Sequence, residues 1–136
     1  MTRNANLFTW DEISPHFTKK EILSPETMNH PYLVDVTALY CLNKLRERIG
    51  EPLFCNRPDL GLTLRGVRSP KEQIRLRDRY PGAATLSMHV QGKAFDISGY
   101  EPELLLELEK LAPECGFTFS LMYLTFIHLD IRQALL

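Results

Sequence analysis

The residues best suited to chemistry lie in one short stretch, from Ser87 to Asp96, with the sequence SMHVQGKAFD. His89 and Asp96 stand seven positions apart, and imidazole and carboxylate are both ligands that suit Zn²⁺. Gly92 lies between them and can take a positive φ, so the chain can turn there. The alternation in residues 93–97 predicts a short strand beyond the turn. We therefore expect a loop histidine and a strand aspartate to converge on one metal ion.

A third ligand is expected near the C-terminus, where residues 126–132 have the sequence FIHLDIR. Its period of two places His128, Asp130 and Arg132 on one face of a predicted strand and Ile127, Leu129 and Ile131 on the other. A catalytic zinc ion takes three protein ligands and leaves one position for water. We therefore predict that His128 joins the two ligands of the first stretch in binding one Zn²⁺.

Such a zinc ion would lower the pKa of its water to about 7 and polarise a peptide carbonyl. A single histidine on a strand is more often a structural residue, so the prediction for His128 depends on the whole set. His16 and His30 have no comparable surroundings in the sequence, and we expect both at the surface or in loops.

The pattern Ser-x-His-x-x-Gly-x-Ala-x-Asp, followed by a late His-x-Asp, resembles the zinc D-Ala-D-Ala carboxypeptidases and L-Ala-D-Glu endopeptidases of bacterial cell walls. Hedgehog-type domains are distant relatives of these enzymes with the same metal set. Weaker similarities occur upstream in the family's order, so that the resemblance extends from about Phe17 to Arg132. They are FTKKE at residues 17–21, a helix and its exit at residues 42–52, and RGVRSP at residues 65–70.

This resemblance implies a zinc-dependent peptidase in which a zinc-activated water attacks a peptide carbonyl of a peptidoglycan stem peptide. It does not separate a carboxypeptidase from an endopeptidase. It also implies that Arg68 reaches the active site, where a guanidinium suits a substrate carboxylate or an oxyanion. Arg65 and Val67 stand where the family has serine and tyrosine, which puts the fit of substrate around Arg68 in question. Ser87 is expected either to cap its loop or to bind substrate.

The general base is not evident from the sequence. The family's well-studied members place an acidic residue three positions before the last histidine, where this chain has Thr125. Asp130 is either the base or a group that orients His128, and orientation is favoured because side chains at i and i+2 of a strand lie close together. Glu101 and Glu114 are candidates from elsewhere in the chain. The alternative function is therefore a catalytically inactive, zinc-stabilised binding or structural module of the same fold.

Composition indicates one globular domain over residues 1–136, with 44% hydrophobic and 24% charged residues. A net charge of −1 excludes a global field that would attract nucleic acid or an anionic membrane. The sequence shows neither an apolar run of ~18 residues nor a signal-peptide core. We expect a monomer that is made in the cytoplasm and acts on the cell wall if released, as phage endolysins do. Cys41, Cys55 and Cys115 are expected as reduced, mostly buried thiols.

An α+β fold is predicted, with helices covering a small antiparallel sheet, and the resemblance implies the arrangement of hedgehog domains and D-Ala-D-Ala peptidases. Thr9 and Thr18 each begin a capping box and should start short helical turns, within an N-terminal arm of residues 1–30 packed on the body. Longer helices are predicted at 35–49, 70–79 and 101–112. Strands are predicted at 94–97, 117–119 and 124–131, with further candidates at 53–55 and 62–65.

Overall fold

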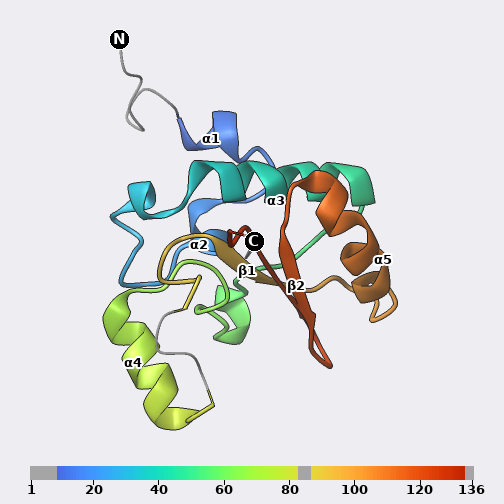
Figure 1. The fold of residues 1–136 in the computed structure, drawn as a ribbon. Helices are drawn as coiled ribbons and strands as arrows, with labels where there is room; N and C mark the ends of the chain where they lie inside the picture. The colour runs from blue at the N-terminus through green and yellow to red at the C-terminus, as the bar shows by residue number, and fades with distance from the viewer. Residues whose placement is uncertain (1–8, 83–86, 134–136) are drawn as a thin grey trace.

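The chain forms helices around a small antiparallel sheet, as the computed structural model shows for residues 9–82 and 87–133 (Figure 1). The strands are β1 (Ala94–Ile97), β2 (Phe119–Met122) and β3 (Ile127–Asp130), in the order β1-β3-β2. The last strand is therefore central and pairs antiparallel with both others. The predicted α+β class is confirmed.

Two of the main helices begin at capping signals that the sequence carries. Helix α3 (Val36–Ile49) starts at Asp35, whose side chain accepts a hydrogen bond from the N–H of the third residue on, and ends at the left-handed Gly50. Helix α4 (Pro70–Arg79) has a complete capping box. Helix α5 (Leu104–Leu111) runs into the 3₁₀ helix η4 (Ala112–Cys115). The shorter helices are α1 (Trp10–Ile13), α2 (Lys19–Ile22), η2 (Pro31–Leu33) and η3 (Pro58–Leu60).

The hydrophobic core covers one face of the sheet. Neighbouring residues of a strand point to opposite faces, so alternate positions of β1 and β3 supply this face. Phe95, Ile97, Ile127 and Leu129 are all fully buried there, in one apolar cluster with residues of α3 and α5. Phe17 and Ile22 of the predicted arm belong to the same cluster. The opposite face of these strands carries the polar side chains. Residues 1–8 of the arm lie outside the described part.

The strands predicted at 53–55 and 62–65 are wrong. Each segment makes only one isolated bridge, and the chain between them turns through η3. The buried Asn56 lies in this region, and its amide donates to the carbonyls of Lys20 and Leu23. Oδ1 of Asn56 accepts the backbone N–H of Arg65 at 2.9 Å, so a side chain satisfies a group of the second segment that a sheet ladder would otherwise have paired.

The strand predicted at 117–119 lies instead at Phe119–Met122, as β2. Two further predicted boundaries also move. The helix expected from residue 101 begins at Leu104, and the strand expected from residue 124 begins at Ile127. The second difference arises because β2 and β3 form a hairpin, in which the N–H of Tyr123 donates to the carbonyl of Phe126 at 2.9 Å. Residues 124–126, which the alternation assigned to the strand, therefore form the tip of this hairpin.

The predicted state of the cysteines is confirmed, because Cys41, Cys55 and Cys115 are free and buried. Burial raises the pKa of each of these thiols. No helix in the described part of the chain is long and apolar enough to cross a membrane.

Candidate metal centre

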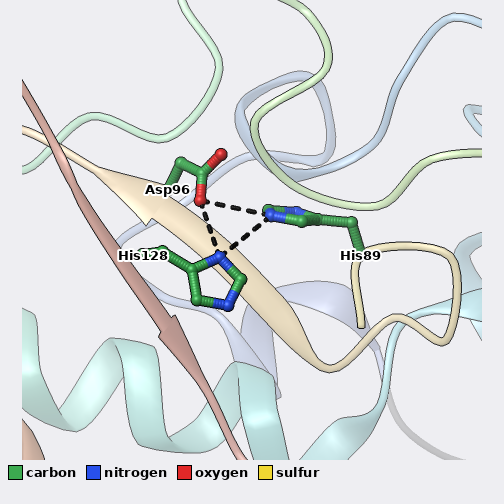
Figure 2. A group of neighbouring side chains, drawn as sticks. All are labelled: His89, Asp96 and His128. Carbon is green, nitrogen blue, oxygen red and sulfur yellow. Dashed lines mark hydrogen bonds and ion pairs between the residues drawn. The ribbon is translucent and has the colours of Figure 1, made fainter. Parts of the chain in front are cut away.

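Three ligand atoms from separate parts of the chain meet at one point (Figure 2). The Oδ1 atom of Asp96 lies 3.2 Å from Nε2 of His89 and 3.0 Å from Nδ1 of His128. The two imidazole nitrogens lie 3.3 Å apart. In a tetrahedral zinc site with ligands about 2.0 Å from the metal, neighbouring ligand atoms are about 3.3 Å apart. The group therefore has the dimensions of a metal site, and it can hold a metal ion.

Strand register brings two of these ligands together. Asp96 on β1 lies directly opposite His128 on the central strand β3, so both side chains project from the same face of the sheet. His89 reaches them from the turn that precedes β1. Gly92 reverses the chain in this turn with a φ of 72°, and a Cβ at this position would lie 2.0 Å from the carbonyl oxygen of Leu33. Only glycine suits both the conformation and the space.

The outer nitrogen of each imidazole is bound to an acceptor. His89 Nδ1 lies 2.8 Å from the carbonyl oxygen of Gly66, and His128 Nε2 lies 2.7 Å from Oδ2 of Asp130. An acceptor requires an N–H, so we assign the proton of each neutral ring to its outer nitrogen. The inner nitrogens then present lone pairs toward the carboxylate of Asp96. Lone pairs that converge in this way repel one another unless a cation lies between them. A metal site has this arrangement, with the metal ion as the cation.

The surroundings of the two histidines shift their pKa values in opposite directions. His89 and Asp96 are buried, and burial lowers the pKa of His89. Burial opposes ionisation of Asp96, but the charge and hydrogen bonds of the two histidines outweigh it and lower the pKa of this carboxyl. Burial also opposes protonation of His128, but hydrogen bonds to Asp130 and Asp96 outweigh it and raise its pKa to about 9. A proton and a metal ion therefore compete for His128.

Asp130 lies behind His128, on the side away from the other two ligands. Its side chain is fully buried, and Oδ2 binds the outer nitrogen of His128. Arg132 binds both oxygens: its Nη2 lies 2.6 Å from Oδ2, and its backbone N–H donates to Oδ1 at 2.9 Å. The guanidinium of Arg132 also lies over the ring of Phe119, 3.5 Å from its centre. Both carboxylate oxygens of Asp130 are thus occupied, and its position suits orientation of the imidazole.

Arg68 lies beside the ligands. Its Nη2 is 3.5 Å from Oδ2 of Asp96, the oxygen that does not face the histidines. Its Nε donates to the carbonyl of Leu64 and its Nη1 to Oε1 of Gln73 at 2.9 Å. The backbone N–H of Arg68 donates to the carbonyl of His89. Two of its three guanidinium nitrogens therefore bind groups other than Asp96, and they fix the position from which Nη2 faces this carboxylate.

Of the remaining predicted residues, one supports the site and the others lie away from it. Ser87 caps its loop, because its Oγ accepts the backbone N–H of His89 at 3.1 Å. Thr125 is exposed at the tip of the β2–β3 hairpin. Glu114 pairs with Arg48 at 3.8 Å, and Glu101 lines a surface hollow beside the same arginine. The structure therefore does not bring either glutamate to the site, which contradicts their candidacy as base.

His16 and His30 also lie outside the ligand group. His16 pairs with Glu47 at the surface, and His30 is exposed beside Tyr32, as expected.

Sequence reasoning missed Gly66, whose carbonyl fixes His89. A Cβ on this glycine would lie 2.1 Å from the carbonyl oxygen of Ile22, so the position cannot carry a side chain without movement of the backbone. The available signal was the glycine of the segment RGVRSP, which stands two residues before Arg68. A backbone acceptor has no side chain of its own to mark it in a sequence.

Comparisons with protein-family models, with curated proteins and with solved structures found no match.

Proposed function

We propose that this chain is a zinc-dependent peptidase that hydrolyses stem peptides of peptidoglycan, with the fold shared by D-Ala-D-Ala carboxypeptidases, L-Ala-D-Glu endopeptidases and hedgehog domains. The observation that carries the proposal is the convergence of three possible ligand atoms, one each from His89, Asp96 and His128, with each outer imidazole nitrogen already bound to an acceptor. Such a donor set, with one carboxylate and two imidazoles, suits Zn²⁺.

When bound, zinc supplies a Lewis acid that polarises a peptide carbonyl and lowers the pKa of a coordinated water. The protein's own residues supply position. Asp130 and the carbonyl of Gly66 hold the two imidazoles in one orientation, and Arg68 holds the carboxylate of Asp96. The N–H groups that Arg68 does not use for these contacts can stabilise negative charge on a carbonyl oxygen of the substrate.

A second candidate, a zinc-stabilised module without catalysis, is favoured by one specific observation. Hydrolysis needs a group that takes a proton, and Asp130 has both oxygens bound by His128 and Arg132. Apart from Asp96, no carboxylate in the described part of the chain joins the ligand group. A chain of this kind would bind zinc and leave peptides intact.

Metal analysis and digestion of purified cell-wall fragments separate these possibilities. We expect about one zinc per chain, loss of zinc in His89→Ala, and retention in the surface control His16→Ala. Mass spectrometry should show cleaved stem peptides that disappear with chelator. Arg68→Gln should retain zinc and cleave ~10²-fold more slowly, as expected for loss of one oxyanion contact.

The outcomes point in different directions. Bound zinc without any cleavage would favour the inactive module. Absence of zinc after purification without chelator, together with no uptake on titration, would contradict both candidates.

A further inference from the structure

A stack of one cation and two aromatic rings lies where β2 turns into β3, next to the strand that carries His128. The rings of Tyr123 and Phe126 are stacked, with centres 4.6 Å apart and an angle of 18° between them. The guanidinium carbon of Arg65 lies 4.9 Å from the centre of the Phe126 ring. Phe126 directly precedes β3, the strand that carries His128, and the carbonyl of Arg65 accepts the backbone N–H of Asp96 at 2.8 Å. The stack therefore borders the metal centre.

The backbone of Arg65 is held on both sides. Its N–H donates to Oδ1 of the buried Asn56 at 2.9 Å, and its carbonyl accepts the backbone N–H of Asp96 at 2.8 Å. The second of these bonds joins Arg65 directly to a metal ligand. Since the ring of Phe126 fixes the other end of the side chain, little rotational freedom remains to be lost when a ligand binds.

Arg65 differs from other arginines near the sheet in having no anionic partner. Arg132 binds Asp130, Arg68 lies beside Asp96, and Arg57 binds Asp59. In the described part of the chain, by contrast, the guanidinium of Arg65 forms neither an ion pair nor a hydrogen bond. Its side chain is half-buried, so its N–H groups can be reached from solvent. A flat, stacked guanidinium with free N–H groups is suited to binding a carboxylate through two hydrogen bonds.

We propose that Arg65, stacked on Phe126, is a carboxylate-binding subsite that receives a carboxylate of the peptide substrate close to the bond that is cut. The identity of the ligand as a peptide rests on the proposed function. In this arrangement Arg68 contacts Asp96 and the carbonyl that reacts. Arg65 binds the carboxylate by which the substrate is selected. The carboxylate comes either from the C-terminus of the peptide or from an acidic side chain.

Calorimetric titration of the zinc-loaded full chain with three probes tests this assignment. The first is N-acetyl-D-Ala-D-Ala with a ketomethylene group in place of the scissile amide, which prevents hydrolysis. The second is its C-terminal carboxamide, which is neutral. The third is a carboxamide with D-Glu in the last position, which carries only a side-chain carboxylate. We expect one of the two acidic probes to bind at least ~10-fold more tightly than the neutral one, and this probe identifies the source of the carboxylate.

Substitutions test whether Arg65 causes the preference for a carboxylate. Arg65→Gln should abolish it, and Phe126→Leu should reduce it, with zinc content and melting temperature unchanged in both. The matched control is Arg57→Gln, because Arg57 also stacks on a ring, that of Phe54 at 4.4 Å, but already binds Asp59. This control should retain the full preference.

The inference is overturned if the wild-type protein binds none of the probes, if it shows no preference for a carboxylate, or if Arg65→Gln keeps the preference. Failure of the proposed function looks different. A protein that shows the Arg65-dependent preference but does not cleave cell-wall peptides has the subsite without the peptidase activity.

Discussion

The two ring nitrogens of His128 have different partners, and the residues around the ring determine which nitrogen faces the candidate metal site. Nε2 binds Asp130, whose charge is in turn held by Arg132, so that Nδ1 is left to face Asp96. Burial opposes ionisation of Asp130, but hydrogen bonds from His128 and Arg132 outweigh it and lower the pKa of this carboxyl. These contacts favour the role of Asp130 as a charged positioning residue, and we expect its contribution to appear in metal affinity.

Asp130→Asn keeps the size of the side chain but removes the charge that orients His128. We expect zinc affinity to fall by ~10- to 100-fold, the range for loss of a residue that supports a ligand. Competition with a chromophoric chelator measures this affinity. Asp59→Asn is the control, because Asp59 pairs with Arg57 away from the ligands. Unchanged affinity with a ~10²-fold or larger loss of cleavage would instead identify Asp130 as the general base.

Zinc binding should depend on pH because His128 must lose a proton. With its pKa raised to about 9, the ring remains protonated at neutral pH in the metal-free protein. Apparent zinc affinity should therefore rise by up to about tenfold per pH unit, and level off above pH 9. The same shift stabilises the metal-free fold below the unfolded pKa of about 6.5, and that contribution is lost as pH rises through 9. A zinc affinity that is equal at pH 7 and pH 9 would contradict this protonation state.

At the scale of the elements, a turn and a strand pairing assemble the centre. The β1–β3 register places Asp96 opposite His128, and the turn before β1 places His89 above them. Gly92 lies in this turn, and its carbonyl accepts the N–H of Asp35, the residue that caps α3. The position of His89 is therefore coupled to the start of the longest helix.

Gly92→Ala should both destabilise the fold and weaken the centre. The positive φ costs ~1–3 kcal/mol for a residue with a Cβ, and the contact with Leu33 forces a backbone shift. Denaturant unfolding and zinc titration together measure the two effects. Gly82→Ala is the matched control, because a Cβ there would meet no atom within 4 Å. If Gly92→Ala unfolded at the wild-type denaturant concentration, the turn would not require glycine.

At the scale of the whole molecule, the core and the metal centre occupy opposite faces of the same sheet. The apolar cluster joins the N-terminal segment, α3, α5 and the strands without a ligand residue among its members. No ligand side chain therefore contributes apolar surface to this described core. Figure 1 shows α4 projecting from the body on its own, away from α3 and α5.

Chelation should accordingly lower the melting temperature without unfolding the protein at room temperature. A ligand that binds only the folded state stabilises it by about 2.7 kcal/mol at a concentration one hundred times its Kd, which corresponds to a rise of several degrees. Calorimetry with and without zinc measures the shift, and far-ultraviolet circular dichroism reports whether the helices persist. His89→Ala should show no shift on addition of zinc. Loss of helical signal on chelation would mean that the metal is required for folding.

Local sequence was sufficient to predict several elements and the ligand set. Helix α4 and strand β1 have the predicted bounds, because a capping box with proline and an alternating segment after glycine are signals contained within a few residues. The grouping of His89, Asp96 and His128 was also predictable from residue type and spacing, whereas the nitrogen of each ring that faces the group was not. Prediction failed at residues 53–65, where apolar segments suggested strands, but the chain turns through η3 and the side chain of buried Asn56 accepts the backbone N–H of Arg65.

Only the tertiary structure decided which groups surround the site and which ligand residue each of them contacts. The place of Asp130 behind His128, the carbonyl of Gly66 against His89, and the stacking of Arg65 on Phe126 each depend on how two segments lie against each other in space. Such contacts follow from strand register and side-chain direction, and a shift of one residue would point each side chain to the opposite face. Local spacing identifies which residues can bind a metal, whereas register determines which groups hold them in place.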